Sequence, residues 1–190
     1  MSSLTFRLAL PSDAPAIQPL VQSAYRGDSS RSKGWTTEAH LLTGNRIDVA
    51  GITNKITAHD SVVILAYHGP HSAPEEGGSV SLIACCEVVK RSCDLAYFGM
   101  FAVDPTRQAG GIGRQVLAYA EQFAKQVFGV KKMEMSVIGV RKELISWYER
   151  RGYRDTGVRG DFPVAEALAA GGAALKGWDE LGFVVLEKML

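Results

Sequence analysis

The most informative segment of the chain is Phe101-Ala-Val-Asp-Pro-Thr-Arg-Gln-Ala-Gly-Gly-Ile-Gly-Arg114. An apolar strand is predicted to end at Asp104, because the proline that follows cannot donate to a β-ladder and restricts its neighbour. The next helix is predicted to begin among Gly110, Gly111 and Gly113, where apolar residues start to recur at helical spacing. The segment therefore predicts a strand, a tight glycine-rich turn and an amphipathic helix.

The glycines at this predicted helix start indicate a site for a phosphate group. The first turn of a helix leaves its N–H groups unpaired and carries partial positive charge. Glycine lets a ligand approach that backbone without a Cβ clash. Arg107 and Arg114 flank the turn and can add full charges. The alternative is a glycine-rich tight turn that binds nothing.

Two common phosphate motifs do not fit this turn. A Walker A loop requires Gly-Lys-Ser/Thr, whereas this chain continues Gly113-Arg114-Gln115. A dinucleotide fingerprint requires a third glycine or alanine, and Val116 stands at that position. A nucleotide-phosphate enzyme is therefore disfavoured.

Hydrophobic periodicity outside this segment predicts a mixed sheet with helices on its faces. We expect one domain over residues 1–190, since the length of 190 residues is typical of a single domain. Residues 27–34 and 68–79 are predicted as loops. Strands are predicted at 4–10, 62–67, 80–89, 95–103, 133–137, around 153 and at 183–189. Helices are predicted at 36–42, 46–59 and 165–174. Three more are predicted: one capped by Ser12 or Asp13 and reaching Tyr25, one from the glycine cluster through Val127, and one that carries Leu144, Ile145 and Tyr148 and ends at Gly152.

Two motifs carry a resemblance to a known family. Gln108-x-x-Gly111-x-Gly113 resembles the acetyl-CoA signature of the GNAT (GCN5-related) N-acetyltransferases, which is Arg/Gln-x-x-Gly-x-Gly/Ala. Leu144-Ile-Ser-Trp-Tyr148-Glu-Arg-Arg-Gly152-Tyr153 resembles the later helix-turn-strand motif of that family. The spacing leaves room for one helix and one strand between the motifs. Many members carry Asn near the start of the later helix, where this chain has Val140-Arg141-Lys142, so Arg141 would have to replace its contacts.

The resemblance implies an α/β (α+β) GNAT-like domain with a mixed, mostly antiparallel sheet. It implies that the strands at 95–103 and 131–138 splay apart, with the pantetheine arm of acetyl-CoA on the first strand and the acetyl group in the wedge. Acetyl-CoA would be the acetyl donor, no metal would be needed, and the acceptor would be a primary amine of a small molecule or peptide. The expected cofactor-binding residues are Phe101, Ala102, Val103, Gln108, Ala109, Gly110, Gly111, Ile112, Gly113, Arg114 and Arg141.

Tyr148 matches the general acid of the family, the hydroxyl that protonates the departing sulfur of CoA. A phenol with a pKa near 10 stays protonated at neutral pH, as an acid must. The alternative is packing in the core at the end of an amphipathic helix, because Leu144 lies one turn earlier.

The general base has three candidates. Glu87 interrupts the apolar run Ala84-Cys-Cys-Glu-Val-Val89, and burial of a lone carboxylate is costly, so it is expected to face a cleft, a partner or water. A partly dry cleft would raise the pKa of this carboxylate and make it a better base near pH 7. Glu38 is the second candidate and a substrate contact, unless it is only a charge at a helix start. A water relay is the third.

Composition narrows the partners. Lys+Arg total 21 and Asp+Glu total 20, so the net charge of +1 gives no basic excess, and we expect neither nucleic acid nor membrane as a partner. Cys85, Cys86 and Cys93 have no zinc-ligand or disulfide pattern, which favours a reducing cytoplasm and buried structural thiols.

The family implies a monomer or a homodimer. The alternative function is a non-catalytic acyl-CoA-binding or sensing module of the same fold.

Overall fold

The computed structural model describes residues 4–69, 81–108, 110–169, 171–175 and 177–190. Their strands form one sheet in the order β1-β2-β3-β4-β5-β7-β6. Among the described residues, β4 and β5 are the one parallel pair, and the other neighbours are antiparallel. The predicted mixed, mostly antiparallel sheet is therefore confirmed. The strands are β1 (Leu4–Leu8), β2 (Ser61–His68), β3 (Leu82–Lys90), β4 (Leu95–Val103), β5 (Lys132–Ile138), β6 (Arg154–Gly160) and β7 (Phe183–Met189).

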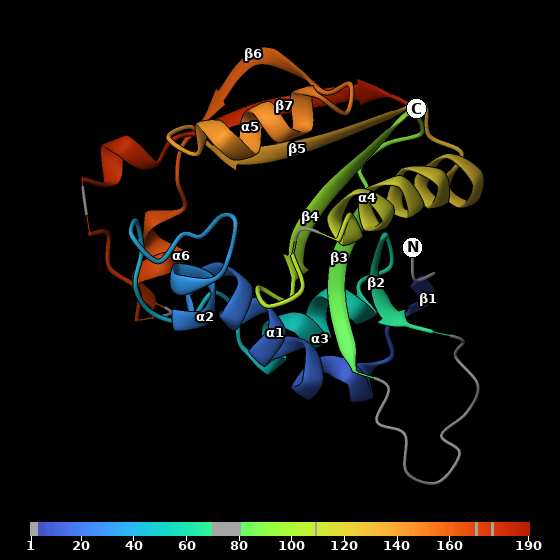
Figure 1. Cartoon of the computed structure of the whole chain (residues 1–190). Coiled ribbons are helices and arrows are strands. Elements are labelled where there is room, and N and C mark those ends of the chain that lie inside the picture. Colours follow the sequence, from blue (N-terminus) through green and yellow to red (C-terminus); the bar gives the residue numbers. More distant parts are fainter. Residues whose placement is uncertain (1–3, 70–80, 109, 170, 176) are drawn as a thin grey trace, which may run out of the picture.

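Helices cover both faces of this sheet (Figure 1). Helix α1 packs with α3 against an apolar cluster on one face, which includes Cys85 and Met100. Helices α4 and α5 bury their apolar residues in a second cluster on the other face, which includes Cys86 and Phe98. Alternating side chains of β3 and β4 thus serve both layers. The helices are α1 (Ala14–Arg26), α2 (Asp28–Ser32), α3 (Val49–Thr57), α4 (Ile112–Phe123), α5 (Lys142–Glu149) and α6 (Val164–Ala169).

The sheet opens between β4 and β5. These strands pair only from Leu95 opposite Lys132 to Tyr97 opposite Glu134, whereas β5 continues its pairing with β7 as far as Ile138. Figure 1 shows β4 and β5 diverging from this shared end. The predicted splay is therefore confirmed, and the edge of β4 beyond Tyr97 has no ladder partner among the described strands.

A β-bulge accompanies this opening. Cys85 lies opposite Ala102 while Glu87 lies opposite Gly99, so β4 has one extra residue across from Cys86. Met100 within the bulge has a φ of 42°, which is uncommon for a residue with a side chain. Bulges bend a strand and re-aim its side chains, so this one helps β4 to turn away from β5.

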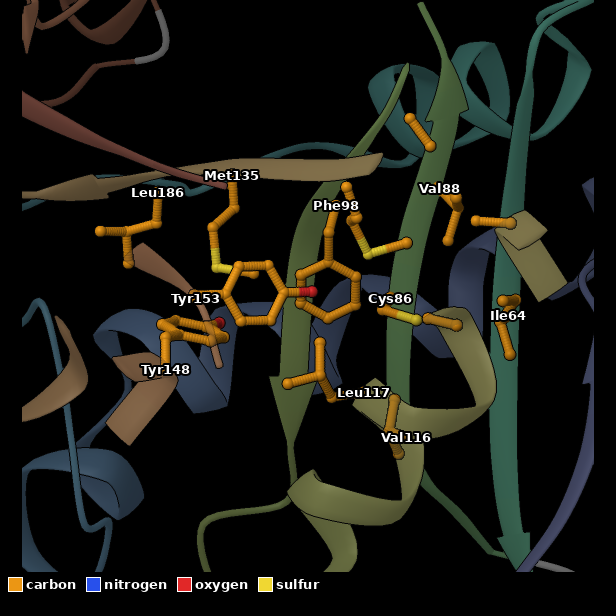
Figure 2. Packing of buried hydrophobic residues seen from close by; sticks show 14 of the residues in the cluster. Ile64, Cys86, Val88, Phe98, Val116, Leu117, Met135, Tyr148, Tyr153 and Leu186 are labelled. Carbon is orange, nitrogen blue, oxygen red and sulfur yellow. The ribbon is translucent and has the colours of Figure 1, made fainter. Parts of the chain in front are cut away.

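The core on the α4 face connects the glycine-rich turn to the later motif (Figure 2). Helix α4 buries Val116 and Leu117 against the sheet, and α5 buries Tyr148. Figure 2 shows Tyr148 and Tyr153 next to each other, close to Phe98 and Met135. The two sequence motifs therefore meet in one apolar layer.

The segment from residue 27 to 42 differs from the sequence prediction. Asp28–Ser32 forms α2 where a loop was expected, and no helix covers 36–42. The N–H of Glu38 donates to the Tyr25 carbonyl, and the Thr37 hydroxyl accepts from the N–H of Ala39. A single turn remains, in which the N–H groups of Leu41 and Leu42 donate to the Glu38 carbonyl, and Leu42 then forms a β-bridge with Ala174 instead of continuing a helix.

No helix in the described ranges has both the length and the apolar character that a membrane crossing requires.

Candidate active site

A cavity of about 540 Å³ occupies the wedge between β4 and β5. Its lining comes from both faces of the sheet. Phe101 and Tyr148 contribute from the α4 face, and Tyr25 and Met100 contribute from the α1 face. A ligand in this cavity could therefore reach from one layer of helices to the other through the open sheet.

The glycine-rich turn forms one end of the cavity. Gly111 precedes the first residue of α4 with a φ of +75°, a conformation that glycine adopts without strain. A Cβ added there would meet nothing within 4 Å, so the space beside this helix start is open. The unpaired N–H groups of the first turn make such a space suitable for an anion.

Three guanidinium groups line the same end of the cavity: Arg114, Arg150 and Arg151. Burial lowers the pKa of Arg151, and the nearby charges of Arg150 and Arg114 lower it further. Within the described chain none of the three has a carboxylate partner. Like charges gathered in this way would be stabilised by a polyanion.

Aromatic side chains form the wall between this end and the sheet. The guanidinium of Arg151 lies 3.4 Å from the centre of the Trp147 ring. Trp147 lies 6.2 Å from Phe101 and 6.3 Å from Trp35, measured between ring centres. The side chain of Gln108 joins the end of β4 to this wall, because its amide donates to the Val103 carbonyl and accepts from the N–H of Trp35 at 2.6 Å.

Tyr148 lines the middle of the cavity and is only 4% exposed. Its ring packs edge-on against Trp147 at 5.0 Å and Tyr153 at 5.8 Å. Burial raises the pKa of Tyr148 well above its ordinary value of 10. None of the described residues forms a hydrogen bond with its hydroxyl. The group thus keeps its proton at every physiological pH and has that proton available for a ligand.

Glu38 and Arg141 form a buried ion pair at the cavity wall. Arg141 donates to the Glu38 carboxylate at 2.7 Å and to the Thr36 hydroxyl at 2.9 Å. Nε of Arg26 lies 3.9 Å from the other carboxylate oxygen. Nε of Arg141 is buried without a hydrogen-bond partner in the described chain.

Glu87 lies outside the cavity lining, beside a residue that lines it. Its carboxylate accepts from Lys55 at 2.7 Å and from the Ser61 hydroxyl at 3.2 Å. Gly99 lies opposite on β4 and lines the cavity, and a Cβ there would be 3.4 Å from the Glu87 carboxylate. The role of Glu87 as a base stays a prediction, as does that of Glu38.

Most of the expected cofactor residues lie together. The cavity is lined by Phe101, Val103, Gln108, Gly111, Ile112, Gly113, Arg114 and Arg141. Ala102 and Gly110 do not line it, and Ala109 lies outside the described residues. Ala102 is directed into the α1 cluster by strand alternation, which leaves its backbone on β4. Their contacts to a cofactor remain predictions.

The sequence analysis missed several lining residues. Trp147, Arg150 and Arg151 stood inside the second quoted motif, and the adjacent arginines at a helix end were a usable signal. Tyr25 and Arg46 carried no such signal, because the fold brings them in from α1 and from a loop. The part of the chain that the structure describes contains no cluster of three or more His, Cys, Asp or Glu side chains suited to a metal.

Known structures share this architecture. An IAA acetyltransferase from Bacillus cereus is 17% identical over 99% of this chain and 100% of its own, with a TM-score of 0.62. A GNAT family acetyltransferase from Elizabethkingia anophelis with acetyl-CoA bound is 16% identical over all of both chains, with a TM-score of 0.62. Spermidine N-acetyltransferase from Vibrio cholerae, in complex with CoA and spermine, is 12% identical over 98% and 95%, with a TM-score of 0.65.

These identities establish likeness of fold. Among curated proteins, none matches the chain. The model of the acetyltransferase (GNAT) family matches residues 42–153, which include β2 to α5 and both quoted motifs. More than half of the sequence, including the splayed strands and the glycine-rich turn, thus follows one family pattern, and the chain belongs to the GNAT acetyltransferase family.

Proposed function

We propose that this protein transfers the acetyl group of acetyl-CoA directly to a primary amine of a small molecule or peptide. The observation that carries the proposal is the cavity through the β4–β5 wedge, with the α4 turn at one end and Tyr148 inside. The Elizabethkingia relative of the same fold holds acetyl-CoA.

The residues at the α4 end fit the polyphosphate part of CoA. The first-turn N–H groups of α4 would bind the pyrophosphate, and the guanidinium groups of Arg114, Arg150 and Arg151 would neutralise phosphate charge. The unpaired edge of β4 from Phe101 to Val103 would bind the amide groups of pantetheine, as an added strand binds a sheet edge. The acetyl group would then lie in the wedge near Tyr148.

The reaction needs two proton transfers around one nucleophilic attack. The amine nitrogen forms a bond to the acetyl carbonyl carbon, and the carbon–sulfur bond of acetyl-CoA breaks. Tyr148 gives its proton to the departing sulfur, so that CoA leaves as a thiol. The amine loses one proton to a base or to water, and an equivalent proton returns through solvent to the Tyr148 oxygen. The products are an N-acetylated amine and CoA, with the protein restored to its starting state.

The base remains open between two carboxylates and water. Glu38 is held by Arg141 at 2.7 Å, and acceptance of a proton would leave that buried guanidinium without its counter-charge. Glu87 is held by Lys55 at 2.7 Å, whose side chain is more exposed. Gly99 lines the cavity and separates Glu87 from it. Glu87 would therefore accept the proton of the amine through a water molecule or across the cavity wall at Gly99.

A matched pair of glycine variants tests the cofactor end. Gly113→Val places its side chain against Phe101, to which a Cβ would come within 3.3 Å, and into the cavity. Gly160→Val is the control, because Gly160 lies on β6 outside the cavity lining and a Cβ there would come no closer than 3.7 Å to its neighbours. Loss of two charge-assisted hydrogen bonds to phosphate would weaken acetyl-CoA binding roughly 100-fold in the first variant.

Calorimetric titration with acetyl-CoA measures both variants, with melting temperatures as the folding control. Equal affinity of Gly113→Val and the wild type for acetyl-CoA would show that the glycine-rich turn does not bind the cofactor. A panel of amines with acetyl-CoA then tests transfer. Tight binding of acetyl-CoA without acetylation of any amine would replace the proposed enzyme with an acyl-CoA-binding module.

A further inference from the structure

Arg46 lines the cavity on the face of the sheet that α1 covers. Its guanidinium carbon lies 5.0 Å from the centre of the Tyr25 ring, and Tyr25 packs with the α1 cluster. The glycine-rich turn belongs to the opposite layer, with α4 (Figure 1). Arg46 is therefore on the side of the wedge away from the proposed phosphate contacts.

The backbone that carries Arg46 is fixed by side chains of α1. The N–H of Arg46 donates to the Gln22 side chain at 2.9 Å. Arg26, one helical turn later on α1, donates to the Thr43 carbonyl at 2.9 Å and to the Asn45 carbonyl at 3.0 Å. Residues four apart share one helix face, so α1 holds this loop at successive turns. The position of Arg46 is thereby set before any ligand arrives, which lowers the entropy cost of binding.

The guanidinium of Arg46 has no ion pair or hydrogen bond with any described residue. The neighbouring carboxylates already have partners, because Glu38 pairs with Arg141 and Glu87 pairs with Lys55. The residue is solvent-exposed, so a ligand can reach it. The Tyr25 ring lies beneath the guanidinium, and a cation–π contact of this kind leaves the N–H groups for hydrogen bonds.

The whole cavity carries a surplus of positive charge. Glu38 is the one acidic residue in its described lining, against Lys33, Arg46, Arg114, Arg141, Arg150 and Arg151. Phosphates of CoA would neutralise the guanidinium groups beside α4. On the α1 side, Glu38 pairs with Arg141, and Arg46 forms no ion pair with any described residue. A polyamine would bring only further positive charge to this side.

We propose that Arg46 binds a carboxylate of the acceptor, so that the substrate class is amines that carry a carboxylate, such as amino acids. This inference rests on the proposed acetyl transfer. The N–H edge of a guanidinium matches a carboxylate with two parallel hydrogen bonds, which fixes orientation as well as affinity. Binding at Arg46 would anchor the acid group and leave the amine to approach the wedge. The spermidine acetyltransferase of Vibrio cholerae, by contrast, is named for an acceptor without a carboxylate.

The test compares the common amino acids with the amines formed by their decarboxylation, for example phenylalanine with phenethylamine and lysine with cadaverine. Each pair is assayed with the wild type, Arg46→Gln and Arg46→Lys. Arg91→Gln is the matched control, because Arg91 also lies over a tyrosine, at 4.1 Å from the Tyr97 ring, but does not line the cavity. For each acceptor, the KM of the variant is divided by the KM of the wild type. This ratio does not depend on the different basicities of the two amines in a pair.

We expect the wild type to favour carboxylate-bearing acceptors. Arg46→Gln should raise their KM roughly 10- to 100-fold and leave that of the decarboxylated amines unchanged. Arg46→Lys should restore part of the loss, because it keeps the charge but not the paired hydrogen bonds. Arg91→Gln should match the wild type.

Two outcomes separate the possible failures. Acetylation of amines without preference for the carboxylate, or an equal KM change for both members of each pair in Arg46→Gln, overturns the role of Arg46 and leaves acetyl transfer intact. Absence of acetylation for every amine, with or without a carboxylate, overturns the proposed function itself.

Discussion

The two ends of the wedge cavity present different kinds of chemical group. The end beside α4 presents backbone N–H groups and guanidinium groups that have no acidic partner in the described chain. The end beside α1 presents side chains already bound to one another, with Glu38 held by Arg141 at 2.7 Å. The first end has the groups that an anion would bind, whereas the second is a framework of paired side chains beside which Arg46 has no ion-pair partner in the described chain.

Because of this difference, we expect the two ends to respond differently to amino-acid substitutions. The α4 end depends on backbone shape, so an added side chain at Gly113 is more damaging there than the loss of one charge. The α1 end depends on side chains that join residues 103 positions apart in the sequence, such as Arg141 and Glu38. A single substitution there disturbs the framework and the acceptor together. Tyr148 lines the cavity between the two ends.

The largest effect on turnover is expected for Tyr148, between the two ends of the cavity. Tyr148→Phe keeps the ring contacts with Trp147 and Tyr153 but removes the proton, so turnover should fall roughly 10²- to 10⁴-fold. Affinity for acetyl-CoA should change little. Tyr153→Phe is the control, because Tyr153 is also a buried tyrosine and does not line the cavity. Steady-state and single-turnover rates measure the effect. An unchanged rate of the chemical step in Tyr148→Phe would show that Tyr148 only packs in the core.

The next effect concerns the framework at the α1 end. Glu38→Gln keeps the shape of the side chain but leaves Arg141 and Arg26 without a counter-charge, which should cost about 3–5 kcal/mol of the free energy of unfolding. The melting temperature should then fall by roughly 6–15 °C. Glu187→Gln breaks a more exposed pair with Lys132 and should cost about 1 kcal/mol or less. Similar melting temperatures for both variants would show that the α1 end is not held by this carboxylate.

A smaller effect is expected for Glu87, beside the α1 face of the wedge. If Glu87 assists deprotonation of the amine, Glu87→Gln should lower turnover roughly 10-fold or more near neutral pH. The loss should shrink as the pH rises, because more of the amine is then already deprotonated in solution. Lys55→Gln removes the ion-pair partner and controls for loss of the contact itself. Parallel pH–rate profiles of Glu87→Gln and the wild type would leave the base to Glu38 or water.

The smallest effect concerns the start of α1, which supports the acceptor end. Arg7 donates to both carboxylate oxygens of Asp13, at 2.7 and 2.8 Å, and this hydrogen bonding lowers the pKa of Asp13 below its ordinary value of 3.8. A carboxyl with a lowered folded pKa stabilises the protein above its unfolded pKa, and the contribution disappears as the pH falls through the folded pKa. The partly exposed pair should contribute about 1 kcal/mol.

Urea unfolding of the wild type and Asp13→Asn measures this contribution. The difference in unfolding free energy should be constant from pH 5 to 7 and decrease progressively below about pH 4. A difference that does not depend on pH would assign the effect of the substitution to packing at the helix start.

The same two ends explain how far the sequence could predict the site. The α4 end is continuous in the chain, so a proline, three glycines and a helical period between Phe101 and Val116 were enough to predict strand, turn and helix. Tyr148 was found because its motif is local to α5. Arg46 has no local pattern, since its place in the cavity lining depends on contacts with Gln22 and Tyr25 on another element. The missing helix at 36–42 has the same cause, because Leu42 forms a β-bridge with Ala174, which is distant in the sequence.

The short seam between β4 and β5 has a consequence for the folding of the chain. It divides the sheet into a unit from β1 to β4 and a unit from β5 to β7, each continuous in sequence and each with long antiparallel ladders. Units of this kind can open separately in native-state hydrogen exchange. A ligand in the wedge cavity, which β4 and β5 both line, would contact both units, so it would couple their opening and raise their stability by mass action.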